Sequence, residues 1–291
     1  VVVGIDQYST EDKPNAIPGL SCAANDAESV AAIIRQSHPP ADLDLVLLTS
    51  PARKGSAANP TRAAVIDALR RASACAGPDD TVVFYFAGHG GMLAGRPSLF
   101  PADVRLTADG SSLHEDSILE VGQLQALFDG CPCPRRVMFL DCCQNAFAAS
   151  SVPAAENDLS PSAHFRALPW RTGLPVSEGL IQALRVLPHG WSVLLSCGPN
   201  ELSLEDPDVG EHGIFSHFLA EGLSGQADLD RDGVVSLAEL AQYVGRRVTR
   251  QAQAVLEGEH DKLESGAEER GNEPAVGQLG QTPTLFCAGP V

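Results

Sequence analysis

No stretch of the sequence approaches the roughly 18 uninterrupted apolar residues that a membrane-spanning helix needs. The first residues, VVVGIDQYS, lack the basic region and small-residue cleavage site of a secretory signal peptide. Basic residues are scarce: 20 lysines and arginines face 37 acidic residues, a net charge of −17. Such a charge disfavours phosphate backbones and favours cationic peptides. We therefore expect a soluble, cytoplasmic chain whose partners include neither a nucleic acid nor a membrane.

Several catalytic and metal-binding patterns are also missing. The sequence has no Gly-x-Ser-x-Gly segment of the kind that carries the nucleophile of serine hydrolases. Its eight cysteines are scattered along the chain rather than packed into a small disulfide scaffold, so we expect most of them to be buried, reduced thiols. Cys131 and Cys133 have no second cysteine or histidine pair at zinc spacing, which argues against a zinc site.

The sequence does contain an alternation of apolar runs and amphipathic stretches. The apolar runs expected to form strands are Val1–Ile5, Leu43–Leu48, Thr81–Phe86, Arg136–Leu140, Trp191–Ser196 and Pro283–Phe286. The stretches expected to form helices begin near Asn25 and Thr61 and cover Ile214–Leu223 and Leu237–Leu256. This alternation indicates an α/β fold with a mostly parallel sheet. Because Val1 falls inside a core strand, we expect the natural protein to have a few residues before it.

The periodic pattern is interrupted between Asn145 and His189, where small and polar residues and three arginines follow one another without a sustained apolar face. This composition is typical of an exposed connection. We expect a large first part over residues 1–149, a linker over 150–188 and a smaller second part over 189–291.

Two reactive side chains follow predicted strands. His89 comes after Thr81–Phe86, within Ala87–Gly91, and Cys143 comes after Arg136–Leu140. The carboxyl ends of parallel strands meet at one edge of a sheet, so this histidine and this cysteine can lie together there. Histidine can take the thiol proton, and the thiolate can then attack a carbonyl carbon.

These segments carry a family resemblance. Phe84–Gly90, with its strand followed by His-Gly, and Leu140–Cys143, with its Asp-x-Cys, resemble the two catalytic motifs of the caspase, metacaspase and paracaspase clan of cysteine peptidases. Further similar segments are Gly4–Tyr8, Leu20–Ala27, Gly213–Ser216, Ala227–Val244 and Gln281–Pro283. The resemblance covers nearly the whole chain and is closest to bacterial, metacaspase-type members. It implies a caspase-like three-layer sandwich, with about six strands flanked by helices.

The chain departs from the metacaspase pattern beside the nucleophile. Asp141–Ala146 reads Asp-Cys-Cys-Gln-Asn-Ala, where metacaspases usually have Asp-Ser-Cys-His-Ser-Gly. Side chains alternate along a strand, so Asp141 and Cys143 share one face and Cys142 points with Leu140 toward the packed side. Cys143 is therefore the predicted nucleophile and His89 its base, with the backbone N–H groups of Gly90 and Cys143 holding the oxyanion.

The resemblance also implies a specificity for basic residues. Asp26 and Asp141 match positions that lie in the primary specificity pocket of metacaspases and paracaspases. Two carboxylates select arginine or lysine at P1, the substrate residue before the cleaved bond, with arginine preferred. The structural alternatives are a favourable helix N-terminal charge for Asp26 and strand-end capping for Asp141.

A loop in the second part matches the EF-hand calcium pattern at positions 1, 3, 5, 6, 9 and 12. The candidate ligands are Asp228, Asp230, Asp232, Ser236 and Glu239, with Gly233 at the sharp turn. Only one such loop is visible, and the competing interpretation is an Asx-rich turn that caps the next helix. The chemistry itself requires no cofactor.

The linker carries Arg166, Arg171 and Arg185, which match the expected P1 preference. We expect activating cleavage after one of them, by the enzyme itself or by an upstream protease. The alternative is a surface insertion that is never cut. A further alternative for the whole chain is a pseudo-peptidase that keeps the fold as a calcium-responsive or partner-binding module; retention of both His89 and Cys143 argues against it.

Overall fold

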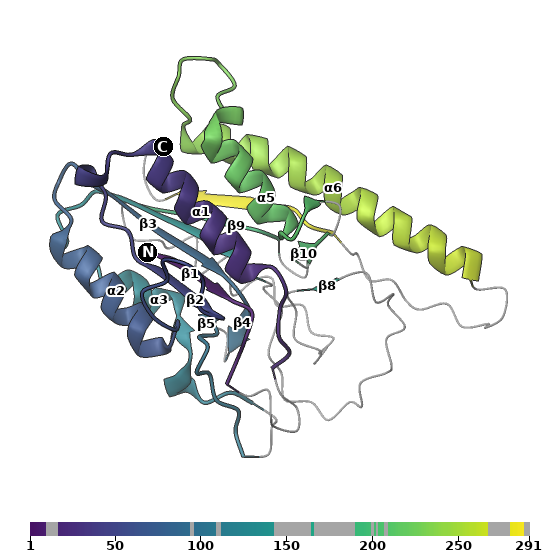
Figure 1. The fold of residues 1–291 in the computed structure, drawn as a ribbon, viewed down its shortest axis with the longest axis horizontal. Helices are drawn as coiled ribbons and strands as arrows, with labels where there is room; N and C mark the ends of the chain where they lie inside the picture. The colour runs from purple at the N-terminus through teal and green to yellow at the C-terminus, as the bar shows by residue number, and fades with distance from the viewer. Residues whose placement is uncertain are drawn as a thin grey trace.

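A computed structural model describes residues 1–9, 17–93, 96–108, 112–142, 164–165, 190–198, 201, 203–206, 209–266 and 280–287. A central sheet of six strands runs through these residues in the order β11-β9-β7-β3-β1-β2, with helices on both faces (Figure 1). Within this described part, no helix combines the length and hydrophobicity that a membrane span requires.

The central sheet is parallel except at one edge. Its strands are β1 (Val2–Ile5), β2 (Leu47–Ser50), β3 (Thr81–Ala87), β7 (Arg135–Asp141), β9 (Trp191–Leu195) and β11 (Thr284–Cys287). Every neighbouring pair is parallel apart from β11 and β9, which are antiparallel. The predicted six-stranded, mostly parallel α/β sheet is therefore confirmed.

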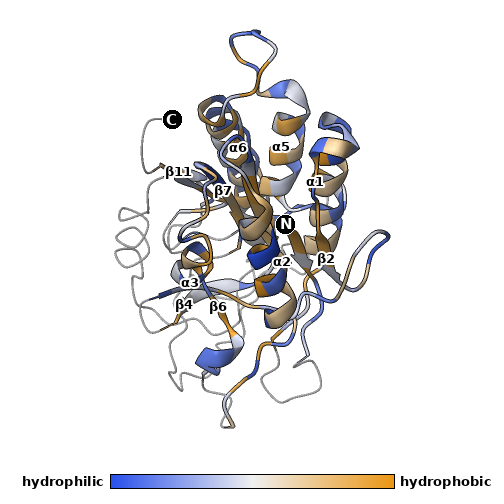
Figure 2. Ribbon diagram, turned by 90° about the vertical axis from the view of Figure 1, so that its left-hand side faces the viewer, coloured by the Kyte–Doolittle hydropathy of each residue, from blue (hydrophilic) through white to orange (hydrophobic). Residues whose placement is uncertain are grey.

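Helices cover the two faces of the sheet. One face carries α1 (Ala23–Ser37), α5 (Ile214–Glu221), which continues into one π-helical turn η4 (Gly222–Gln226), and α6 (Leu237–Gly266). The other face carries α2 (Arg62–Cys75) and α3 (Val121–Ala126). The apolar side chains of the strands belong alternately to these two layers. Figure 2 shows the strands of the sheet coloured mainly as hydrophobic, between the helices.

Smaller elements complete the fold at the carboxyl edge of the sheet. A three-stranded sheet contains β4 (Gly90–Leu93), β5 (Arg96–Leu99) and β6 (Leu119–Glu120), and a two-stranded pair contains β8 (His164–Phe165) and β10 (Leu204–Glu205). A short 3-10 turn, η2 (Glu115–Ser117), precedes β6, and another, η1 (Pro40–Asp42), lies elsewhere, between α1 and the start of β2.

Two boundaries differ from the sequence prediction by more than two residues. The strand expected over Leu43–Leu48 is β2 over Leu47–Ser50, because its register with β1 begins where Val2 pairs with Leu47. The helix expected to end at Leu256 continues to Gly266 as α6, through a stretch without an apolar stripe in which glutamate, lysine and leucine favour helix and two glycines do not. The predicted start of the second helix holds, since the Thr61 hydroxyl accepts the N–H of Ala64 at the start of α2.

Candidate active site

His89 follows β3 directly, with only Gly88 between them, and its side chain is fully buried. Its backbone N–H donates to the Tyr8 hydroxyl at 2.7 Å, and its ring lies 5.2 Å from the Tyr8 ring, centroid to centroid. Its Nε2 lies 2.9 Å from the carbonyl oxygen of Pro18. A carbonyl can only accept, so Nε2 carries the hydrogen in this contact and Nδ1 is left as the basic nitrogen.

The strand register relates His89 to the predicted nucleophile. β3 and β7 are parallel, and Ala87 pairs with Asp141 at their ends. His89 and Cys143 each follow this pair by two residues in the sequence. Cys143 itself lies outside the described residues.

Cys142 is fully buried and belongs to the same apolar cluster as Leu140, whereas Asp141 contacts α5 on the opposite face of the sheet. The predicted alternation at this strand end therefore holds for these three residues. A Cβ atom added to Gly90 would lie 2.8 Å from the Cys142 sulfur, so a larger residue at position 90 would press on the strand end that precedes Cys143. The oxyanion role of Gly90 stays a prediction.

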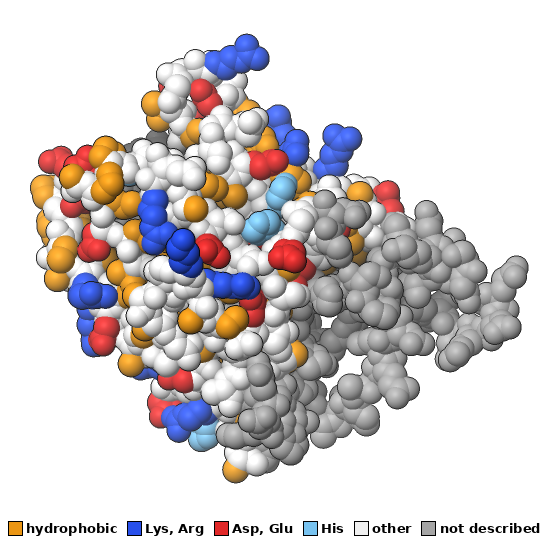
Figure 3. Space-filling view, in the orientation of Figure 1, with side chains coloured by type: hydrophobic (Ala, Val, Ile, Leu, Met, Phe, Trp, Pro, Cys, Tyr) orange, Lys and Arg blue, Asp and Glu red, His pale blue; other side chains and the backbone are white. Residues whose placement is uncertain are grey.

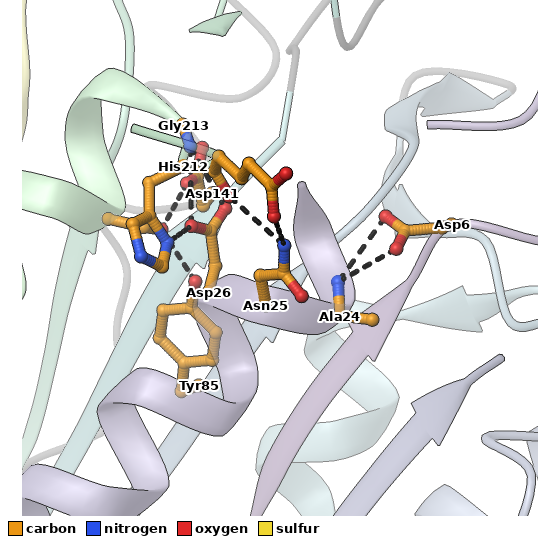
Figure 4. Close-up of polar contacts among 10 residues, drawn as sticks. Asp6, Ala24, Asn25, Asp26, Tyr85, Asp141, His212 and Gly213 are labelled. Atoms are coloured by element: carbon orange, nitrogen blue, oxygen red, sulfur yellow. Dashed lines mark hydrogen bonds and ion pairs between the residues drawn. The ribbon is translucent and has the colours of Figure 1, made fainter. Parts of the chain in front are cut away.

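Asp26 and Asp141 are fully buried, and both are held at the N-terminal end of α5 (Figure 4). The Gly213 N–H donates to the Asp26 carboxylate at 3.2 and 3.3 Å, and His212 Nδ1 lies 2.8 Å from the same group. Ser216 Oγ, three residues after Gly213, donates to Asp141. The structure thus brings the two predicted specificity carboxylates to one end of one helix.

Asp141 has two further supports. Ser203 Oγ donates to its other oxygen at 2.6 Å. The Tyr85 hydroxyl lies 2.5 Å from Ser216 Oγ, and because the hydrogen of Ser216 points to Asp141, Tyr85 is the donor in that contact. A carboxylate that accepts such hydrogen bonds is stabilised in its charged form.

A buried glutamine connects this network to the last strand of the sheet. Gln281, which precedes β11, donates through Nε2 to the Ser196 carbonyl at 3.1 Å and to Ser203 Oγ at 3.3 Å. Its Oε1 accepts the Leu204 N–H at 3.1 Å. The position of Ser203, and through it that of Asp141, therefore depends on a residue near the far end of the chain.

Asp6 adds an acidic group that the sequence did not indicate. It follows β1 and accepts the N–H of Ala24 with both carboxylate oxygens at 3.3 Å (Figure 4). This contact fixes the N-terminus of α1, which carries Asp26 in its first turn. The proposed alternative for Asp26, a favourable charge at a helix N-terminus, is thus also satisfied by its position.

The EF-hand-like loop leads into α6, away from the sheet (Figure 1). Carboxylate oxygens of Asp228, Asp230 and Asp232 lie within 4.8 Å of one another. Gly233 has a φ of +87°, the left-handed turn that the pattern requires. Glu239 accepts the N–H and the hydroxyl of Ser236, and these hydrogen bonds lower its pKa.

The Ser236 hydroxyl in turn accepts the Glu239 N–H at 3.2 Å, which completes a capping box at the start of α6. The interpretation of this loop as a turn that caps the next helix is therefore realised in the structure. The loop also has the oxygen ligands of the calcium pattern, from Asp228, Asp230, Asp232 and Glu239. The three linker arginines, Arg166, Arg171 and Arg185, lie outside the described residues.

Comparison with known proteins settles the family. The model of the caspase domain, a peptidase family, matches residues 1–288. The chain belongs to the caspase domain family. The resemblance seen in the sequence is confirmed, and the six-stranded sheet with helices on both faces is the architecture of a caspase domain.

One curated protein and one solved structure are similar to this chain. This caspase domain is 28% identical over 145 residues to Metacaspase-1 of Schizosaccharomyces pombe, an alignment that covers 45% of the chain and 32% of that protein. The match thus spans about a third of the length of the curated relative. The crystal structure of protein GSU0716 from Geobacter sulfurreducens has 20% identity and a TM-score of 0.55, covering 100% of this chain and 93% of that one. The second likeness concerns the fold alone.

Proposed function

We propose that this caspase domain is a cysteine endopeptidase that cleaves after arginine, and less efficiently after lysine, with Cys143 as nucleophile and His89 as base. Family membership and the metacaspase relative support a caspase-like cysteine peptidase. The observation that carries the proposal is the setting of His89: a buried imidazole at the end of β3, held at Nε2 by the Pro18 carbonyl, beside the strand that leads to Cys143.

The proposed chemistry follows from that tautomer. His89 Nδ1 takes the proton of the Cys143 thiol, and the thiolate attacks the carbonyl carbon of the substrate. The N–H groups of Gly90 and Cys143 stabilise the oxyanion, and the imidazolium returns its proton to the leaving amine. Water then hydrolyses the thioester, giving its proton to His89. No metal takes part in these steps.

The proposed P1 preference rests on two carboxylates, from α1 and β7, that lie at the N-terminal end of α5. Asp26 and Asp141 are buried carboxylates at the N-terminal end of that helix: Asp26 receives a hydrogen bond from the N-cap residue Gly213, and Asp141 receives one from Ser216 in the first turn. A planar guanidinium can bond two carboxylates at once, whereas an ammonium acts as a point charge, which favours arginine over lysine. An aspartate at P1 would meet like charges.

We also propose that the linker between the two parts is cleaved during activation. The strand β8 directly precedes Arg166 in the sequence and pairs antiparallel with β10. In this register Phe165 is opposite Leu204 and His164 is opposite Glu205. β10 directly follows Ser203, the hydrogen-bond partner of Asp141. Extended peptides bind to proteases by this kind of strand addition, so the pairing supports Arg166 as a P1 residue in the linker.

Intact-mass analysis tests linker cleavage. Active protein is expected to be cut after Arg166 or Arg171 and the Cys143→Ala variant to stay whole, because cleavage by the enzyme itself needs the nucleophile. Replacing the three linker arginines with glutamine should leave an uncut chain of reduced activity. The same change at Arg70, an exposed side chain of α2, should alter neither linker cleavage nor activity. Full activity from an uncut chain would show that activation does not depend on the linker.

We also propose that the loop between η4 and α6 binds a calcium ion. Isothermal titration calorimetry is expected to detect one site, because three carboxylates already converge there. Glu239→Gln should remove most of the binding heat while preserving the helix, since glutamine also completes a capping box. The exposed Glu257→Gln on α6 serves as control. No heat at about millimolar calcium, or unchanged heat in Glu239→Gln, would leave the loop as a capped turn.

A further inference from the structure

His212 is a partly exposed side chain whose ring contacts the buried carboxylate of Asp26 (Figure 4). Its Nδ1 is 2.8 Å from Asp26 Oδ1, and 30% of the His212 side chain is exposed while none of the Asp26 side chain is. Histidine side chains reach the surface over α5, with acidic side chains beside them (Figure 3). The imidazole is therefore the member of this pair that can exchange a proton with water.

The protonation state of His212 decides the charge of the pair. A neutral imidazole donates its Nδ1 hydrogen to Asp26, and the pair then carries one negative charge. A second proton, on Nε2, makes the imidazole a cation and brings the net charge of the pair to zero. Imidazole is the side chain that changes charge most readily within the pH range in which a protein can be assayed.

Other charged groups surround His212. Glu211 precedes it in the same loop, and the His217 ring of α5 lies 6.5 Å away, centroid to centroid. His217 Nε2 is 3.5 Å from Glu221, which also contacts Arg247 of α6. Burial lowers the pKa of His217, so His217 takes up its proton at a lower pH than an ordinary imidazole. Among the residues that the structure describes, the acidic side chains on the sheet side of this turn include Asp26, Asp141 and Glu205.

We propose that His212 sets the charge of the site that binds the P1 side chain, and so determines the affinity of that site for a basic side chain. This inference rests on the proposed P1 preference. With His212 neutral, a P1 guanidinium meets the full charge of Asp26; with His212 protonated, a fixed cation already neutralises that carboxylate and repels the ligand. His212 is thus a specificity-determining residue that acts through Asp26, and the pocket weakens as the pH falls.

Binding to the full chain carrying Cys143→Ala tests this without interference from turnover. Fluorescence anisotropy would compare two peptides, one with P1 arginine and one with P1 citrulline, which has the same shape without the charge. We expect the dissociation constant of the arginyl peptide to rise about tenfold from about pH 8 to about pH 5.5. The dissociation constant of the citrullyl peptide should change less than about twofold, since citrulline is uncharged.

Two matched variants isolate the histidine. His212→Asn keeps an amide N–H that can donate to Asp26 but cannot take up a proton, so the arginyl peptide should lose its pH dependence. His217→Asn makes the same change 6.5 Å away and should retain it. If the His212→Asn protein does not melt cooperatively, the His212→Gln variant is used in its place. The comparison of the arginyl and citrullyl peptides on protein that retains His212 tests the inference independently of both variants.

The outcomes separate this inference from the proposed function. Arginyl binding that is equal at both pH values, or that keeps its pH dependence in His212→Asn, overturns the role of His212 and leaves the P1 preference standing. An arginyl peptide that binds no better than the citrullyl peptide at either pH contradicts the P1 preference and this inference together.

Discussion

Replacing His89 with alanine is expected to lower kcat/KM for arginyl peptides by a factor of about 10³ or more, because the buried imidazole is the only proposed acceptor of the thiol proton. Cys143→Ala should be equally inactive. The double variant should be no worse than either single variant, since base and nucleophile act as one unit and their losses do not add. Fluorogenic peptide assays measure all three.

Cys142→Ala is the matched control for the nucleophile. Cys142 is buried against Gly90 in the apolar layer, so its loss should perturb packing and lower the melting temperature without abolishing turnover. Turnover that survives Cys143→Ala, or that is lost in a folded Cys142→Ala protein, would assign the nucleophile to a different residue.

Removing the charge of Asp26 is expected to have the second largest effect. Asp26→Asn should lower kcat/KM for arginyl peptides by about 10², because one of the two carboxylates proposed to bind the guanidinium is lost from a buried site. The asparagine oxygen can still accept the Gly213 N–H, so the start of α5 should stay in place. A truncation to alanine would remove that contact as well.

Peptides that differ only at P1 make this prediction specific. The Asp26→Asn effect should disappear with a citrullyl peptide, and unchanged protein should prefer arginine over lysine and refuse aspartate. Efficient cleavage after aspartate would contradict the proposed pocket. An equal loss for arginyl and citrullyl peptides would indicate that Asp26 supports the structure rather than the specificity.

Much of the fold could be predicted because each central strand is a continuous apolar run between amphipathic stretches. β3 and β7 have nearly the expected bounds for this reason. β4 and β5 could not be predicted, since Gly90–Leu93 and Arg96–Leu99 are short and contain glycine or proline rather than a β-branched alternation. Their pairing depends on tertiary contacts at the edge of the sheet.

Two residues of the candidate site could be placed from the strand pattern. His89 and Asp141 come directly after apolar runs, so their place at the edge of the sheet follows from the α/β pattern. Asp26, in the first turn of α1, was predictable only from the family resemblance, and the place of Cys143 stays a prediction. The Pro18 carbonyl that orients His89 has no sequence signature, because any residue can supply a backbone oxygen. Ser203 meets Asp141 from 62 residues away, at a separation at which local patterns carry no information.

Labelling by an electrophilic arginyl peptide, such as an arginyl chloromethyl ketone, tests the central claim most directly. Mass spectrometry after digestion should locate a single adduct on Cys143, and His89→Ala should greatly slow its formation because the thiol then lacks its base. An aspartyl analogue should label far more slowly. Adducts on Cys142 or on exposed Cys75, or no labelling of a folded chain, would contradict the assignment of Cys143 and His89 as the catalytic pair.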